Sequence, residues 1–427
     1  MDTQQNTKWY YGWNIVAAAT ILTLLTVGMR MGIGPFFLPI ISDLGFSRSE
    51  LSAVIAIGML FYGLGMPVAG HLVNTKGTRF VLVLGTAIVV ASSVWTVMAG
   101  SLISFFLAYG ICLSIGLAFT SPVALTPVIS RWFIRQRGMA LFFLSTGSMA
   151  GIAIMTPVFT YAIEGFGWQK TILGFAVLFA IITISAAIFI IREQAPEHAD
   201  QLVPATQAKN TGQSNNQAQL KTPAAKLAHA ETPLSIKQAI RTRSFWKIVI
   251  GLFACGYSMN LLGTHGVPML MDHGFDSSSS ALGIGLIGLV AIFSTLVLGR
   301  LSDILPRRYM LATIYFVRGL GFFGLVAVVI EWQLFGVATV GGVVWAGSIA
   351  LSSAILADIY GVKLVGVLYG LAYLGHQVGG MISSWLGGWA YEVFQTHWIS
   401  FGSAGALLLI AAVVSFTLPD KKQVPKH

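Results

Sequence analysis

Two arginines stand inside apolar stretches of the sequence, where a charged side chain is energetically unfavourable. Arg30 stands well beyond Trp13, deep inside the first apolar stretch, and Arg318 stands in the middle of the apolar segment 309–330. A charge in hydrocarbon is tolerated only when it is paired or hydrated, so an arginine there is a candidate functional residue. A guanidinium can hold a carboxylate through two parallel hydrogen bonds. Arg30 is therefore a candidate anchor for an organic anion.

Both arginines also allow structural interpretations. Arg30 could extend its side chain towards the membrane surface, or pair with a loop acid such as Asp43 or Glu50. For Arg318 we favour a structural partner within the second half of the chain. If both arginines faced one cavity instead, a dicarboxylate would fit better than a monocarboxylate. The tyrosines that could line an apolar cavity, or simply pack, are Tyr62, Tyr109 and Tyr257.

Polar side chains also interrupt two apolar segments in the second half of the chain. Helical spacing places Tyr373 and His376 on one face. A histidine titrates near neutral pH, so His265 and His376 are candidates for carrying a proton or for binding an anion when protonated. Each could instead be a neutral hydrogen-bonding residue, as could Asn260 between helices. With Arg30, the candidate substrate-binding residues are Asn260, His265, Tyr373, His376 and Gln377.

The composition requires lipid as the solvent for these segments. Of 427 residues, 56% are hydrophobic and 9% are charged, whereas a soluble domain has about 25% charged residues. Apolar stretches of roughly 20 residues, enough to cross a hydrocarbon layer, recur between short polar breaks, without the alternating polarity of barrel strands. We expect an all-α protein of the lipid bilayer with twelve transmembrane helices, at residues 13–40, 49–71, 79–99, 102–130, 138–163, 169–191, 245–271, 279–301, 309–330, 332–358, 362–392 and 397–418.

The lysines and arginines are distributed unevenly between the two sides of these helices. If the N-terminus is cytoplasmic, 21 of them fall in inside segments and two, Arg48 and Lys170, fall in outside loops. Such a bias predicts cytoplasmic termini. We therefore expect a multi-pass protein of the bacterial inner membrane with both termini in the cytoplasm. The net charge of +10 is explained in this way without a nucleic acid partner.

The motifs of other function classes are absent from the sequence. It contains no Gly-x-x-x-x-Gly-Lys-(Ser/Thr) phosphate-binding loop and no His-Glu-x-x-His. Cys112 and Cys255 both fall inside predicted helices, so we expect neither a disulfide nor a cysteine metal cluster. We predict that the protein is not an enzyme and that it uses no cofactor and no metal.

The twelve predicted helices form two related sets of six. The segment between 194 and 235 is rich in Gln, Asn, Thr, Ala, Lys and Pro and cannot support a core. Nearly the same offset in numbering relates Pro39 to Pro268 and Glu164 to Glu392, so the second set repeats the first in order. Because paired helices would run the same way through the membrane, this is a parallel repeat. We expect an N-terminal six-helix bundle at 1–193, a cytoplasmic linker at 194–240 and a C-terminal six-helix bundle at 241–427.

A motif after the second predicted helix resembles the signature of the major facilitator superfamily. The signature Gly-x-Leu-x-Asp-(Arg/Lys)-x-Gly-(Arg/Lys)-(Arg/Lys) is matched in part at 70–79 and more fully by its copy at 299–308. Asn74 stands where the family has an acid, so we expect a weaker charged gate in the first half. The residues to which we assign gating or structural roles are Asn74, Arg79, Asp303, Arg307, Arg308 and Arg318.

An end-to-end resemblance is to bacterial members of the monocarboxylate porter family, relatives of the oxalate/formate exchangers. It is carried by Trp-Tyr-Tyr-Gly-Trp at 9–13, Gly-Met-Arg at 28–30, Thr-His-x-x-Pro at 264–268 and Gly-His-Gln-x-Gly-Gly at 375–380. The resemblance implies a secondary transporter of small carboxylates such as lactate or pyruvate, coupled to a proton and working by alternating access. Animal members carry an acid and an arginine in helix 8, whereas residues 279–299 contain no charge here. We expect a functional monomer.

Three alternative functions stay open at this point. One is anion exchange of the dicarboxylate/formate type. Another is proton-driven export of amphipathic compounds on the same fold, although exporters of this kind usually carry an acid inside the first half, and here the acids before Glu164 lie at loop positions. The last is a sensor that does not transport. A sensor would need a signalling domain or docking tail, and the sequence indicates neither.

Overall fold

The computed structural model describes residues 10–133, 136–195 and 235–419, and the side chains at 137, 138, 303, 362, 363 and 366 lie outside this description. All regular structure within it is helical. The first half (10–195) contains α1 (Gly12–Met31), α2 (Gly34–Leu44), α3 (Arg48–Lys76), α4 (Thr78–Met98), α5 (Leu102–Phe105), the π-helical η1 (Phe106–Leu113), α6 (Ser114–Phe119), α7 (Pro122–Trp132), α8 (Arg137–Ala150), η2 (Gly151–Met155), α9 (Thr156–Phe166), α10 (Trp168–Ser185) and η3 (Ala186–Ile190). The second half (235–419) contains α11 (Ile236–Ile240), α12 (Arg243–Asp272), α13 (Ser277–Ile304), α14 (Arg307–Val326), α15 (Glu331–Val343), α16 (Gly347–Tyr360), α17 (Val362–Phe394) and α18 (Trp398–Phe416).

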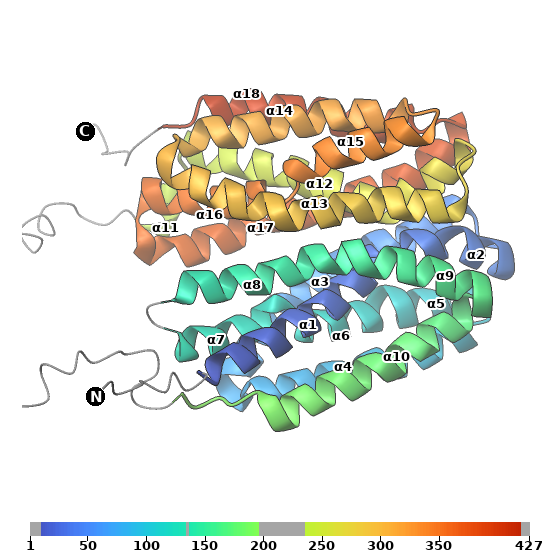
Figure 1. The fold of residues 1–427 in the computed structure, drawn as a ribbon, viewed down its shortest axis with the longest axis horizontal. Helices are drawn as coiled ribbons and strands as arrows, with labels where there is room; N and C mark the ends of the chain where they lie inside the picture. The colour runs from blue at the N-terminus through green and yellow to red at the C-terminus, as the bar shows by residue number, and fades with distance from the viewer. Residues whose placement is uncertain (1–9, 134–135, 196–234, 420–427) are drawn as a thin grey trace, which may run out of the picture.

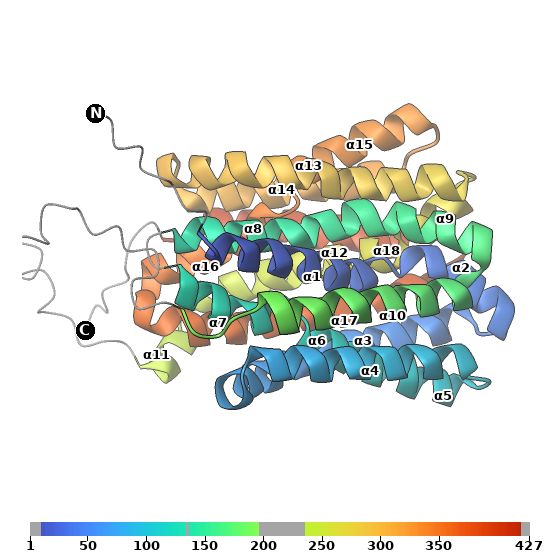
Figure 2. The same cartoon turned by 60° about the horizontal axis from the view of Figure 1, so that its bottom comes forward.

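The helices of the two halves form two groups that lie side by side (Figure 1). The start of α1 and the short helix α11 lie at the left end of this view, which we call the terminal end. α2 ends at the opposite end, which we call the distal end. Turning the molecule shows the same long axis shared by both groups (Figure 2). The two groups meet chiefly where α17 packs on α3, where α13 packs on α8, η2 and α9, and where α2 packs on α12.

The helices are long and apolar enough to cross a membrane. Eleven helices or stacked helical segments among the described residues meet this condition. The remaining predicted span, 362–392, corresponds to α17, which is 33 residues long and packs along both α12 and α3. His376, Gln377 and several glycines make α17 less apolar than the other eleven. The predicted fold class, an all-helical membrane protein, is confirmed.

Two predicted spans are interrupted by proline. The span 13–40 is divided at residues 32–33 into α1 and α2, and the span 102–130 is divided at residues 120–121 before α7. Pro35 and Pro122 stand in the first turn of α2 and α7. Proline has no N–H to continue the hydrogen bonds of a preceding helix, so each helix ends and a new one begins. The predicted spans did not include these breaks.

The predicted span 332–358 is also broken, at residues 344–346 in the middle of the membrane segment. Gly341, Gly342 and Gly347 flank the break, and glycine has a low helix propensity. α15 approaches α13 closely here, because a Cβ built on Gly342 would lie 2.8 Å from the carbonyl oxygen of Ile287. The break leaves the last carbonyls of α15 and the first N–H groups of α16 without partners in their own helices.

Glycines set the same close helix contact in each half. A Cβ on Gly151 of η2 would lie 2.7 Å from the carbonyl oxygen of Leu24 in α1. A Cβ on Gly379 of α17 would lie 2.3 Å from the carbonyl oxygen of Phe253 in α12. In the internal repeat, Gly151 corresponds to Gly379, and Leu24 corresponds to Phe253. The internal repeat read from the sequence therefore corresponds to equivalent packing.

Candidate functional site

Arg30, near the end of α1, joins the two halves at the centre of the molecule. Its Nη2 donates to the amide oxygen of Asn260 in α12 at 3.0 Å, and lies 3.2 Å from the sulfur of Met59 in α3. The guanidinium carbon lies 4.2 Å from the ring centroid of Tyr62. Its Nε is buried without a hydrogen-bond partner. Among the described residues, no carboxylate forms an ion pair with Arg30.

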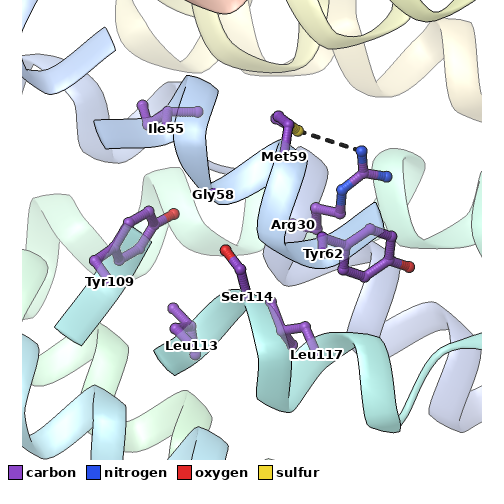
Figure 3. A pocket seen from close by; sticks show the side chains of 9 residues that line it. All are labelled: Arg30, Ile55, Gly58, Met59, Tyr62, Tyr109, Leu113, Ser114 and Leu117. Carbon is purple, nitrogen blue, oxygen red and sulfur yellow. Dashed lines mark hydrogen bonds between the residues drawn. The ribbon is translucent and has the colours of Figure 1, made fainter. Parts of the chain in front are cut away.

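Arg30 is the charged residue in the lining of a cavity within the first half (Figure 3). This Arg30 cavity encloses about 350 Å³, including the open space at its mouth, between α3, η1 and α6. Its remaining wall is apolar apart from Tyr62, Tyr109, Ser114 and the thioether of Met59. The lining therefore combines one cationic group with a mainly apolar surface.

Three of the candidate residues lie together on α17. The ring of His376 stacks on Tyr373 at 4.7 Å, and His376 Nδ1 lies 3.2 Å from the side-chain oxygen of Gln377. The Nε2 atoms of His376 and of Gln377 are both buried without a partner.

Close backbone contacts bring α17 against the residues around Arg30. A Cβ on Gly63 of α3 would lie 3.0 Å from Cγ of Gln377, and a Cβ on Gly380 would lie 2.3 Å from Nδ2 of Asn260. Five predicted site residues, Arg30, Asn260, Tyr373, His376 and Gln377, are thus placed near one another. Their position is consistent with a shared site between the halves.

His265 lies apart from this group, towards the distal end. Its Nε2 is 2.8 Å from the carbonyl oxygen of Ser384, and its ring meets Phe37 edge-on at 4.9 Å. Ser52 of α3 lies 3.5 Å from the same nitrogen. The Arg30 cavity is lined by first-half residues alone, so neither His265 nor the other second-half candidates belong to its lining. It belongs instead to the contacts that close the distal end.

An ion pair between the halves dominates the distal end. Arg48, the first residue of α3, donates from Nη1 and Nη2 to Asp272, the last residue of α12, at 2.6 and 2.8 Å. Asp272 also accepts from His397 Nε2 at 2.9 Å. The Arg48 guanidinium lies 4.1 Å from the ring of Tyr391, which stacks on His397 at 4.3 Å. These four side chains hold α3, α12, α17 and α18 together.

Sequence reasoning did not identify Asp272 and His397 as functional, although the repeat contained a signal. In the first half, Asp43 accepts a hydrogen bond from Trp168 Nε1 at 3.0 Å. The offset of the repeat makes Asp272 the counterpart of Asp43, and each carboxylate contacts a side chain at the start of the last long helix of its half, Trp168 for α10 and His397 for α18. The repeat could not predict that Arg48 lies beside Asp272, because this pair depends on how the two halves pack against each other.

The residues predicted to gate the terminal end hold each half together internally. Arg79 Nε donates to the carbonyl oxygen of Ile191 at 2.7 Å. Arg307 Nη1 lies 2.8 and 2.7 Å from the two oxygens of Asp358, and Arg308 Nη1 donates to the carbonyl of Leu418 at 3.1 Å. Asn74 is exposed, and the side chain of Asp303 lies outside the description.

Polar contacts between the halves are confined to one side of the molecule. For pairs in which both residues are described, each hydrogen bond or ion pair joining the halves lies at Arg30 or at the distal end. The terminal end contributes none to this set. Within this set, the distal end therefore holds most of the polar contacts between the halves.

The sequence matches the family model of the Major Facilitator Superfamily over residues 19–330 and 288–427. It is 24% identical to an uncharacterized MFS-type transporter, YcxA, of Bacillus subtilis (strain 168), over 97% of this chain and 94% of the relative. It is also 24% identical to human monocarboxylate transporter 11, over 96% of this chain and 83% of that protein.

A solved structure with the same fold is a bacterial homologue of the human lysosomal transporter Spinster, in an inward-facing and occupied conformation. The TM-score is 0.70 at 15% sequence identity, covering 96% of this chain and 97% of that one. The helical fold, the repeat of close helix contacts and the family match agree with the signature motifs. The chain belongs to the Major Facilitator Superfamily and is a multi-pass membrane transporter, not an enzyme.

Proposed function

We propose that this transporter carries small monocarboxylates and that Arg30 holds the substrate carboxylate. One observation carries the proposal: the Arg30 guanidinium lines a mainly apolar cavity and, among the described residues, meets only uncharged partners. A monocarboxylate supplies the missing negative charge and an apolar body for the cavity wall. Relatives named monocarboxylate transporters 11 and 6 support the same substrate class.

Asn260 completes the site from the second half. Because Arg30 donates to Asn260 across the two halves, a bound carboxylate competes with the Asn260 amide for the same guanidinium. Substrate binding thus changes a contact that links α1 to α12. Gln377 and Tyr373 supply further polar groups from α17.

The repeat of the two halves and the contacts that join them at the distal end support alternating access. In the proposed mechanism, residues 1–193 and 241–427 rock about the Arg30 site, joined by the linker at 194–240. With both termini in the cytoplasm of a bacterial inner membrane, the closed distal end faces outwards and this state is inward-facing. Opening to the outside then requires the Arg48–Asp272 pair to separate. One chain contains both halves and acts as a monomer.

We assign proton coupling to His376 rather than to His265. The His376 Nε2 has no partner among the described residues, whereas the His265 ring is held by the Ser384 carbonyl in the distal closure. A proton on His376 adds positive charge near Arg30, where the carboxylate binds. Proton and anion binding therefore favour one another, and the coupling is reciprocal.

Uptake of radiolabelled lactate into proteoliposomes tests the role of Arg30. Loss of hydrogen bonds to a charged group, worth about 1.5–3 kcal/mol, predicts that Arg30→Gln lowers apparent affinity by roughly 10- to 100-fold. Arg30→Lys keeps the charge and is expected to retain part of the uptake. The matched control is Arg131→Gln, because Arg131 is exposed at the end of α7. Lactate uptake that Arg30→Gln leaves unchanged would refute the assignment.

The same vesicles separate symport from exchange. Under symport, an inward proton gradient drives uptake into empty vesicles, and His376→Gln abolishes this gradient-driven component. Under anion exchange, uptake needs internal formate or oxalate and ignores the gradient. Uptake that occurs only into anion-loaded vesicles rejects the proton-coupled mechanism and leaves the Arg30 site intact.

A further inference from the structure

A second cavity lies within the second half, between α12, α13, α14 and α15. It encloses about 280 Å³, including the open space at its mouth. Apolar side chains such as Leu262, Ile287 and Phe322 form most of its wall, and Arg318 is the charged residue in its lining. It shares no lining residue with the Arg30 cavity. The two arginines therefore serve different cavities.

Arg318 is a buried cation without a matching anion. Its side chain is 1% exposed. Nη1 has only long contacts, at 3.6 Å to the sulfur of Cys255 and 3.5 Å to the carbonyl oxygen of Trp345, and Nε and Nη2 are buried with no partner. No carboxylate among the described residues pairs with it. A charge this deep in a membrane protein requires a counter-charge or water.

Further hydrogen-bond donors surround the Arg318 guanidinium at the break between α15 and α16. The guanidinium carbon lies 4.1 Å from the ring of Trp345. The Nε1 of Trp345, which can only donate, is buried without an acceptor. α16 begins just after it, at Gly347, and the N-terminus of a helix favours negative charge. Among the described residues, this place offers positive charge and a free donor but no anionic partner.

We infer that the second cavity binds a small monovalent anion, either a halide or the carboxylate of a short acid, against Arg318. Both kinds of ligand supply one negative charge and hydrogen-bond acceptors, and the apolar wall admits no second charged group. The site goes beyond the transport site at Arg30. Because the arginines line separate cavities, they bind two separate anions rather than the two ends of one dicarboxylate.

Binding to the purified full-length protein tests this site. Equilibrium dialysis is done with radiolabelled chloride and radiolabelled formate in a buffer whose only other anion is gluconate. All proteins carry Arg30→Gln, which removes the first site from the measurement. The Arg30→Gln protein is expected to bind one anion. Adding Arg318→Gln is expected to weaken binding by roughly 10- to 100-fold, because hydrogen bonds to a charged group are lost.

A second variant keeps the test valid if Arg318→Gln does not fold. Gly321 lines the cavity, and a Cβ built there meets nothing within 4 Å, so Gly321→Leu adds a bulky apolar side chain to the cavity lining. It is expected to weaken anion binding while Arg318 is retained. The control is Gly336→Leu, which also meets open space but lies outside the lining. We expect Gly336→Leu to bind normally.

The outcomes separate the ligand classes and the two proposals. Mutual competition of chloride and formate supports a shared anion site, and binding of one alone identifies the class. No binding to the Arg30→Gln protein overturns the inference, as does binding that neither Arg318→Gln nor Gly321→Leu weakens. Since the assay measures binding without Arg30, its failure is distinct from a failure of monocarboxylate transport.

Discussion

Glu164 and Glu392 are counterparts in the internal repeat, and each accepts a hydrogen bond from the first turn of a helix in the opposite half. Glu164, near the end of α9, accepts a hydrogen bond from the Ser277 hydroxyl at the start of α13. Glu392, near the end of α17, accepts from the backbone N–H of Ser49 at the start of α3, at 2.9 Å. Each carboxylate lies at the N-terminus of a helix in the other half, where the helix dipole favours negative charge. The distal closure therefore repeats the symmetry of the chain.

Neutralising either glutamate is expected to loosen the distal closure by a similar amount. A charge at a helix N-terminus contributes about 0.3–1 kcal/mol, so Glu164→Gln and Glu392→Gln should each shift the equilibrium up to about fivefold. The readout is labelling of a Ser52→Cys probe by an impermeant maleimide, with Cys112 and Cys255 replaced by serine. Ser52 is buried near His265 in the closure. Unchanged labelling in both variants would show that these contacts do not hold the halves together.

Removing Asp272 is expected to harm stability more than removing Arg48. Asp272→Asn leaves both Arg48 and His397 without their acid, whereas Arg48→Gln leaves the His397–Asp272 contact in place. The two side chains are 20% and 13% exposed, so we expect coupling of about 1–3 kcal/mol in a double-mutant cycle. Thermal unfolding in detergent supplies the energies. Strictly additive losses would mean that the ion pair contributes nothing.

Gly256 is expected to tolerate no side chain, because α17 crosses α12 at this point. A Cβ on Gly256 would lie 1.9 Å from the carbonyl oxygen of His376, so Gly256→Ala forces the helices apart at a cost of about 1–3 kcal/mol. On α17 itself, a Cβ at Gly370 meets nothing within 4 Å. Gly370→Ala should be neutral or stabilising, since alanine favours helix. Equal thermal midpoints for Gly256→Ala and Gly370→Ala would contradict the close crossing of α12 and α17 at Gly256.

His273 should make the distal end sensitive to acid. Burial lowers the pKa of His273, the charge of His397 lowers that pKa further, and Asp272 opposes both. The folded protein therefore binds this proton less readily than the unfolded chain. The resulting stability is present above the ordinary histidine pKa of about 6.5 and is lost as the pH falls through the lower folded pKa. As the pH is lowered, the thermal midpoint should fall less steeply for His273→Gln than for the unchanged protein. Identical pH profiles for the two proteins would exclude this role for His273.

Much of the fold could be predicted from the sequence, because the signals involved are local. Apolar stretches define the spans, and a constant offset, such as that from Glu164 to Glu392, reveals the repeat. The rarity of charge in hydrocarbon singled out Arg30 and Arg318. The breaks within the spans 13–40 and 332–358 were not predicted, since hydropathy registers neither the missing N–H of proline nor the low helix propensity of glycine.

The tertiary structure alone decided which polar side chains meet. Arg30 and Arg318 look alike in the sequence, yet one faces Asn260 between the halves and the other lies in a separate cavity beside Trp345. His265 joins the distal closure, while His376 stacks on Tyr373 and contacts Gln377 on α17. The physical reason is that these contacts depend on the rotation and crossing of whole helices. Those are set by close backbone approaches between residues far apart in the sequence, which no local pattern encodes.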